Sequence, residues 1–378
     1  MRLVRIRAIL AALAFIVLST AVLSGRIARQ MPDLEVYWRA GARAAAGEPL
    51  YRTDDQHYQF KYLPAFAVLA MPLGAVALDT AKTAWFAASV ALLVGFVTLS
   101  LKLPISRYGP TWLIVASVIV TMGKFFGHEL ILGQVNLLFG VVAVGSFLAL
   151  RAKRDIAAGA LIALAIVVKP YAVIFLPWLA VQRRLRATLA AAGGLVVALA
   201  LPLTRYDLER TLALHSEWWQ TVTGSTAPNL LNQDNVSIAA MFAKWLGPGG
   251  LASWLTVALG ALLMLLAAFV VARRRDVVSP EGLEGSLLLT LIPLLSPQGW
   301  DYVLLIATPA VVYVVNYRAF LPAGLRVLTF ASLATIGLSL FDVLGRATYA
   351  RFMALSIVTI CFFFVIAALV ALRVRRIA

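Results

Sequence analysis

Long apolar stretches alternate with short polar ones along almost the whole chain. The apolar segments lie at about 8–24, 62–78, 82–101, 111–123, 135–150, 155–181, 187–203, 250–272, 284–296, 301–315, 325–341 and 352–372. A helix needs about 20 residues to cross the hydrocarbon core, so some of the shorter segments are expected to be half-crossings. Open strands would leave backbone groups unpaired in lipid. The pattern therefore predicts an all-α polytopic membrane protein, with one integral membrane domain over residues 1–378.

Composition supports this prediction. The chain is 62% hydrophobic and 13% charged, whereas a soluble domain carries about 25% charged residues. The net charge of +16 does not indicate nucleic acid here, because the basic residues gather in triplets beside apolar segments. The triplets are Arg2, Arg5 and Arg7; Arg151, Lys153 and Arg154; Arg183, Arg184 and Arg186; Arg273, Arg274 and Arg275; and Arg373, Arg375 and Arg376. They are typical of cytoplasmic loops, and anionic lipid head groups are their expected partners.

The triplets also predict the orientation of the chain. An uncleaved first helix after Arg7, rather than a signal peptide, leaves both termini inside. The loops at about 25–61 and 204–249, and residues 297–300, are then outside. Five apolar segments precede the second triplet, and this odd number allows two topologies. There are twelve crossings if that triplet breaks the rule, or ten if one of the five segments is re-entrant and 155–181 is a hairpin turning near Lys169-Pro170.

Metal and disulfide chemistry find little support in the sequence. Cys361 is the single cysteine and lies in an apolar segment, which excludes a disulfide within the chain. His57, His128 and His215 lie far apart in the sequence. We therefore expect neither a metal nor another cofactor.

The first outer loop mixes carboxylates with aromatic side chains. Its stretch from Glu35 to Gly47 has the pattern of an amphipathic helix that lies in the membrane interface. The alternative interpretation is an ordinary aromatic belt with solvated charges.

Other polar groups next to apolar segments allow two interpretations each. Asn232, Gln233, Asp234 and Asn235 either bind sugar hydroxyls or cap a helix that begins near Ser237. Lys169 either meets a lipid phosphate or extends to an interface. Asp301 either caps the segment after Trp300 or takes part in catalysis.

Several of these stretches, in this order, resemble glycosyltransferase family 87 of the GT-C superfamily. An acidic residue and YWRA in the first loop are followed by GEPLY, FKYLP and MPLG, and later by GQVN, VVKP, NQDNVS and LLSPQGW. The family includes polyprenol-phosphate-mannose-dependent mannosyltransferases of mycobacteria. The resemblance implies a bundle of about 10–12 membrane helices with a large first outer loop. The sequence departs from the family pattern at His128 and at Asp301, where relatives often carry Asn and His.

The resemblance also implies an activity and a site. The enzyme would move a hexose, mannose by family inference, from a polyprenyl phosphate to a lipid or glycan acceptor outside a bacterial cytoplasmic membrane, inverting the anomeric carbon. Asp33 matches the catalytic base, with Glu35 as its rival. The departing phosphate needs positive charge, and Lys169 is favoured over Lys61, Arg39 and Arg205. The expected substrate-binding residues are Glu35, Tyr37, Trp38, Tyr62, His128, Gln134, Asn136, Asn232, Gln233, Gln298 and Trp300.

A transporter or flippase for lipid-linked sugars is the alternative function. Such a protein should show broken helices at corresponding positions of two halves, and the sequence shows no such symmetry. A non-catalytic scaffold would not need Asp33. The sequence names neither the acceptor nor the oligomeric state.

Overall fold

The computed structural model describes residue 25 and residues 29–378, and 79% of the structure is helical. The described residues form no strand, and one isolated bridge pairs Asn235 with Trp300. The elements are α2 (Pro32–Ala46), η1 (Thr53–Tyr58), α3 (Pro64–Leu69), α4 (Met71–Gly74), α5 (Leu78–Leu101), α6 (Thr111–Leu132), α7 (Asn136–Arg151), α8 (Asp155–Val168), η2 (Pro170–Ile174), α9 (Phe175–Val181), α10 (Leu185–Ala200), η3 (Leu201–Thr204), α11 (Leu208–Gly224), α12 (Thr226–Asn229), α13 (Ile238–Leu246), α14 (Gly250–Ala272), η4 (Arg274–Asp276), α15 (Glu281–Leu295), η5 (Asp301–Ala307), α16 (Thr308–Asn316), η6 (Arg318–Phe320), α17 (Ala323–Leu338), α18 (Phe341–Leu344), α19 (Arg346–Ala354) and α20 (Ile357–Val374).

Five helical segments of the described chain are long and apolar enough to cross a membrane. They are 78–101, 111–132, 185–204, 250–272 and 357–374, and five shorter apolar helical segments accompany them. The prediction of an all-α polytopic membrane protein is confirmed. The expected first helix at 8–24 lies outside the described residues.

The chain folds into two compact units, each built from several stretches of sequence. The first comprises 1–96, 127–143 and 155–224, and the second comprises 97–126, 144–154 and 225–378. The single domain expected over 1–378 stays a prediction.

In the first unit, the loop at 25–61 packs against the first part of the loop at 204–249. Arg205 donates to the carbonyls of Ala44 and Ala45, and Tyr206 donates to that of Glu48 at 2.9 Å. Two loops that were predicted to share one membrane face are therefore in contact. The predicted amphipathic helix is also present as α2, which ends at Ala46 and has Gly47 as its C-cap.

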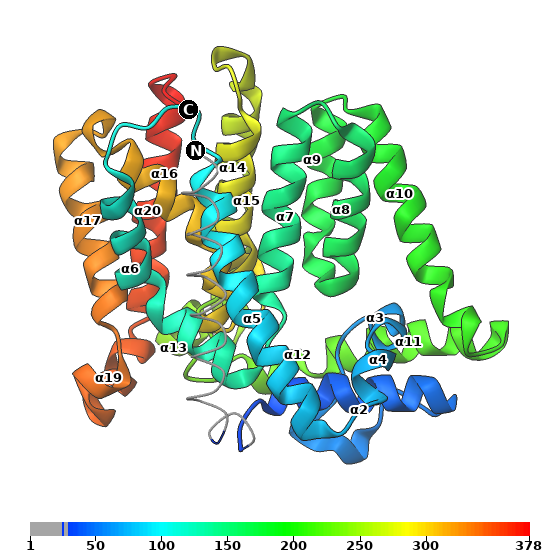
Figure 1. Ribbon diagram of the computed structural model, residues 1–378. Coiled ribbons are helices and arrows are strands. Elements are labelled where there is room, and N and C mark those ends of the chain that lie inside the picture. Colours follow the sequence, from blue (N-terminus) through cyan, green and yellow to red (C-terminus); the bar gives the residue numbers. More distant parts are fainter. Residues whose placement is uncertain (1–24, 26–28) are drawn as a thin grey trace. The chain divides into compact units, whose positions relative to one another are not determined.

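The segment at 62–78 is not a crossing, contrary to the prediction of a membrane segment there. It folds as α3 and α4, which have six and four residues and are too short to span a bilayer. Each helix has a proline in its first turn, where the missing amide hydrogen costs no helical hydrogen bond. Both helices pack on α2 (Figure 1). Hydropathy alone could not separate this short packed pair from a spanning helix.

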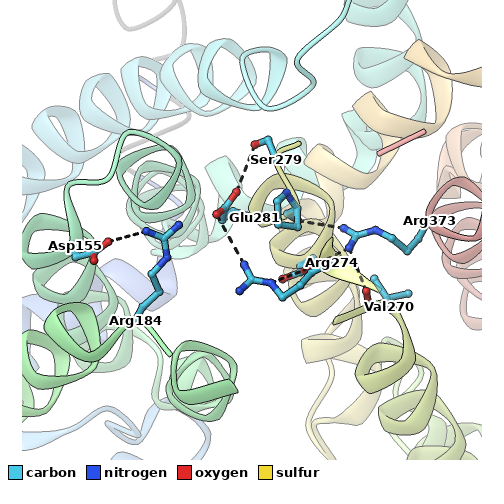
Figure 2. A network of polar contacts seen from close by, with 9 residues as sticks. Asp155, Arg184, Val270, Arg274, Ser279, Glu281 and Arg373 are labelled. Carbon is cyan, nitrogen blue, oxygen red and sulfur yellow. Dashed lines mark hydrogen bonds and ion pairs between the residues drawn. The ribbon is translucent and has the colours of Figure 1, made fainter. Parts of the chain in front are cut away.

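The segment at 155–181 is a hairpin, as the ten-crossing alternative requires. α8 ends at Val168, Lys169 is extended, and η2 and α9 lead the chain back. Arg184, just after α9, forms an ion pair with Asp155 at the start of α8 at 3.2 Å, so the two ends of the hairpin meet (Figure 2). α10 then packs along α8 (Figure 1). Without 62–78, the five segments before the second basic triplet become four, and the inconsistency in the topology disappears.

In the second unit, the main helical contacts join α17 with α20 and α13 with α14. At the end of α20, Arg373 is fully buried and donates to the Glu284 carboxylate at 3.2 Å and to the Val270 carbonyl at 3.1 Å. Arg274 approaches the same carboxylate at 3.6 Å and that of Glu281 at 3.8 Å (Figure 2). This network fixes the last turn of α20 to the ends of α14 and α15.

Candidate active site

Helix α2 brings Asp33 and Tyr37 to one face of the first unit. Its first turn contains Pro32 and Asp33, and a carboxylate near a helix N-terminus is favoured by the helix dipole. Asp33 and Tyr37 lie one helical turn apart and therefore point in the same direction. Glu35 points to another face and pairs with Arg39 at 3.3 Å and Lys82 at 4.0 Å. The two candidate bases therefore point to different faces of α2.

The turn between α6 and α7 brings Gln134 to the start of α2. Gly133 has φ +71, which favours glycine, and a Cβ there would lie 2.9 Å from the Cβ atoms of Met31 and Leu34. The Met31 amide also donates to the Ile131 carbonyl at 3.0 Å. A side chain at Gly133 would thus push the two segments apart.

The side-chain amide of Gln134 joins an acidic group to a basic one. Its Nε2 donates to the Asp33 carboxylate at 2.7 Å. Its Oε1 accepts from Tyr37 at 3.1 Å and from Lys169 Nζ at 3.3 Å. The Gln134 amide therefore links the Asp33 carboxylate to the Lys169 ammonium through two hydrogen bonds.

Lys169 lies at the turn of the hairpin, where α8 has ended and η2 has not begun. Its Nζ donates to the Tyr62 hydroxyl at 2.9 Å and lies 4.8 Å from the centre of the Tyr62 ring. Tyr62 shares a hydrogen bond of 2.6 Å with Tyr37. Lys169 therefore points into this cluster, and the alternative that it extends to an interface is wrong.

A second, more deeply buried group of polar side chains lies beside the first. Glu129 is 1% exposed and accepts hydrogen bonds from Asn136 Nδ2 at 2.8 Å and from the Leu137 amide at 3.0 Å. Tyr171 donates to Asn136 at 3.3 Å. We did not single out Glu129 or Tyr171 from the sequence. Glu129 lies in the same stretch of sequence as Gln134 and Asn136, GHELILGQVN. This proximity was the signal in the sequence that could have found it.

The remaining predicted residues of the first unit lie around this cluster. Burial lowers the pKa of Lys61, and the negative charge of Asp33 opposes that shift, so Lys61 is within electrostatic reach of the carboxylate. Trp38 is turned away and donates to the Val76 carbonyl at 2.8 Å. Arg39 pairs with Glu35 and, at 3.8 Å, with Asp55. His128 is half-buried on α6.

The sequence model of glycosyltransferase family 87 matches residues 60–297, which is more than half of the chain. The chain belongs to glycosyltransferase family 87. It is therefore a membrane glycosyltransferase, and membership of the GT-C superfamily is consistent with the match. The matched stretch contains Tyr62, Gln134 and Lys169, whereas Asp33 precedes it. Neither a search of curated proteins nor a search of solved structures found a match.

Four of the predicted substrate-binding residues of this glycosyltransferase belong to the second unit, where they hold loops together. Gln298 donates to the hydroxyls of Ser225 and Thr226, at 3.1 Å each. Asn232 accepts from the Asp234 amide at 2.9 Å, and Gln233 is exposed, with its carbonyl bound by Lys244. Trp300 forms the bridge with Asn235.

The NQDNVS stretch of the transferase precedes a helix, as the capping interpretation requires, but the cap is Ser237 rather than one of residues 232–235. Ser237 caps α13 by accepting from the Ala240 amide at 3.1 Å. Asn235 accepts from the Ser237 amide and donates to the carbonyls of Asn229 and Pro297. This stretch therefore fastens the loop to the turn at 296–300, where a Cβ on Gly299 would collide with the Pro293 carbonyl.

Asp301 of the transferase forms a buried ion pair. Its carboxylate lies 3.0 Å from Lys124 Nζ, and the two side chains are 1% and 2% exposed. No side-chain cap is present at the start of η5. Tyr349 lies over Lys124 at 4.9 Å and donates to Asp234 at 3.4 Å. Sequence reasoning missed Lys124, because only the tertiary fold brings it to Asp301.

Lys244 completes this second polar group. It donates to the carbonyls of Gln233 and Asn235, at 2.9 and 2.7 Å. Burial lowers its pKa to about 8, against the opposing negative charges of Asp234 and Asp301. Its main-chain contacts indicate that Lys244 holds the 233–235 loop in place.

Proposed function

We propose that this glycosyltransferase moves a hexose from a polyprenyl phosphate to a lipid or glycan acceptor, with inversion at the anomeric carbon. Asp33 acts as the general base and Lys169 meets the donor phosphate. Mannose is the proposed sugar, on the strength of the family resemblance given above. The loop at 25–61 brings Asp33 and Tyr37 to the site on the outer face of a bacterial cytoplasmic membrane, because the basic triplets favour the cytoplasmic side.

The observation that carries this proposal is the position of the Gln134 amide between Asp33 and Lys169. Transfer needs a base for the acceptor hydroxyl and a positive charge for the leaving phosphate, both close to one anomeric carbon. Asp33 and Lys169 contact opposite ends of one amide, at 2.7 and 3.3 Å. The carboxylate and the ammonium are therefore close enough together to act on one anomeric carbon.

The proposed reaction is a single displacement. The acceptor oxygen bonds to the anomeric carbon, the bond from that carbon to the phosphate oxygen breaks, and the acceptor proton passes to Asp33. The polyprenyl phosphate leaves with the bonding electron pair. Lys169 stabilises its negative charge, and the Tyr62 hydroxyl, held by Lys169 at 2.9 Å, is placed to donate to it.

The test is a donor comparison with the purified protein in lipid vesicles. Radiolabelled polyprenyl-phosphate mannose, the corresponding glucose lipid and a nucleotide-linked mannose are each supplied with a lipid and glycan extract as acceptor. The proposal expects label to move into a new product from the mannose lipid and not from the nucleotide sugar. Transfer from the nucleotide sugar alone would contradict the donor class. Movement of the labelled lipid across the vesicle membrane without any product would favour the transporter.

A further inference from the structure

An apolar groove lies in the second unit, on the side where α17 and α20 meet. It has a volume of about 380 Å³ and is lined by Leu266 of α14, by Pro322 before α17, and by Ala367, Val370 and Ala371 of α20. Arg375 stands at the C-terminal end of α20 and contributes to the same groove. Apart from this arginine, the groove offers a ligand no charged side chain.

The surroundings of Arg375 differ from those of the neighbouring arginines. Arg373 (Figure 2) is paired with Glu284, and Arg376 approaches Asp276 at 3.8 Å. Arg375 is exposed, and its hydrogen bond is to the Phe320 carbonyl at 3.0 Å. Within residues 29–378, no carboxylate lies at ion-pair distance from Arg375. The 28 residues before them contain no Asp or Glu. The Arg375 charge is therefore left for a ligand.

We infer that this groove binds an anionic phospholipid, with one acyl chain in the groove and its phosphate on Arg375. α14 and α20 have the length and apolarity of membrane-spanning helices, so a groove between them faces hydrocarbon. A guanidinium matches the geometry of a phosphate through paired N–H donors. Two further exposed arginines of the basic triplets, Arg275 and Arg376, raise the local concentration of anionic head groups.

Other occupants fit the groove less well. A helix of a partner protein is about 10–12 Å across, which a groove of about 380 Å³ does not accommodate. A sugar or a soluble anion would leave the apolar lining exposed, since its hydroxyls would find hydrogen-bond partners only at Arg375. The acyl chain of a phospholipid would cover the apolar lining, and its phosphate would bind Arg375.

The inference is independent of the proposed transfer reaction, since none of the groove residues belongs to the cluster around Asp33. A ligand that binds the folded state adds to its stability according to its concentration and affinity. We therefore expect the lipid to stabilise the packing of α14 and α20.

The experiment is native mass spectrometry of the purified full chain with phosphatidylglycerol, phosphatidylcholine or polyprenyl phosphate added singly and in competition. Three variants are compared with the wild type. Arg375→Gln removes the charge, Ala371→Trp fills the groove, and Arg346→Gln removes an exposed arginine elsewhere in the same unit. We expect one phosphatidylglycerol to bind more tightly than phosphatidylcholine. Arg375→Gln should weaken that binding about tenfold, as expected for loss of a charge-assisted hydrogen bond, and Arg346→Gln should leave it unchanged.

Three results would overturn the inference. Phosphatidylglycerol could bind to Arg375→Gln and Ala371→Trp as it does to the wild type. Polyprenyl phosphate could displace it at equimolar concentration, which would make the groove a donor-lipid site. A dimer that only the wild type forms would assign the groove to a second copy. Because Arg375 is exposed, its variant should remain folded even where Ala371→Trp does not.

Discussion

Gln134 holds the base and the phosphate-binding lysine of the proposed site through one buried amide, which is 5% exposed. Gln134→Leu would keep the size of the side chain but would remove the hydrogen bonds to Asp33 and Lys169. Hydrogen bonds to charged groups contribute about 1.5–3 kcal/mol each, so we expect the transfer rate to fall about 10–100-fold. The measurement is the steady-state transfer rate at a fixed donor concentration. Gln220→Leu, at an exposed site on α11, is the control, and a Gln134→Leu rate within twofold of wild type would contradict the role.

Lys124 and Asp301 provide a test of buried charge in the second unit. Lys124→Met would leave the Asp301 carboxylate buried without its cation, which should cost about 3–5 kcal/mol of unfolding free energy. Adding Asp301→Asn should recover most of that loss, because the uncompensated charge disappears. Denaturant unfolding in detergent measures both variants, with the exposed Lys102→Met as control. A double variant no more stable than Lys124→Met would show that the charge balance is unimportant.

Motifs led from the sequence to Asp33, Tyr37, Tyr62, Gln134 and Lys169, and hydrogen bonds join these five in the structure. The sequence did not lead to Glu129 or Lys124. Both are buried. The partner of Glu129, Asn136, lies in the same stretch of sequence, whereas Lys124 meets Asp301 only through a tertiary contact, which no local pattern contains.

At the scale of elements, the hairpin of α8, η2 and α9 makes a topological prediction. Cysteines introduced at Ala152 and Arg186, in a Cys361→Ala background, should react with an impermeant reagent from the same side of the membrane. A cysteine at Asp54, in the first loop, should react from the opposite side. Labelling of intact and opened vesicles measures this. Reaction of the first two positions from opposite sides would mean that 155–181 crosses the membrane, which would contradict the ten-crossing alternative.

The contact between α2 and η1 makes a prediction about pH. Arg43 donates to the Asp55 carboxylate at 2.8 Å, and this hydrogen bond lowers the pKa of Asp55 below its ordinary value of 3.8. The stabilisation is fully present above the unfolded pKa near 4 and is lost as the pH falls through the lower folded value. Melting temperatures between pH 3 and 6 should therefore fall more steeply toward acid in wild type than in Asp55→Asn. Asp54→Asn is exposed and should retain the wild-type slope; equal slopes for all three proteins would rule out this contribution.

The sequence predicted a helix well where an apolar segment was long enough to span a membrane and carried few charges, as for α5, α14 and α20. The prediction at 62–78 was wrong, because its apolar residues pack on α2 rather than on lipid. An apolar run indicates burial but does not say against what. The amphipathic pattern of α2 was more informative, since it gave both the helix and the face that carries Asp33 and Tyr37.

For the whole molecule, composition was sufficient to predict a polytopic helical membrane protein, and the ordered motifs were sufficient for the family. The alternation of basic triplets came close to the topology. Its one inconsistency arose from counting the segment at 62–78 as a crossing, and the number of crossings stays a prediction. The division into two compact units was not predicted, since contacts between distant segments define it.

The central claim is that Asp33 is the base of a polyprenyl-phosphate-dependent sugar transfer. The most direct measurement is the single-turnover rate of label transfer from polyprenyl-phosphate mannose by Asp33→Asn, beside Glu35→Gln and the exposed Asp54→Asn. General-base catalysis accelerates a reaction about 10²–10⁴-fold. The transfer rate of Asp33→Asn should therefore fall at least about 10²-fold, while the protein remains folded. Glu35→Gln and Asp54→Asn should stay near the wild-type rate. Retained transfer by Asp33→Asn, or its loss in Glu35→Gln alone, would contradict the assignment.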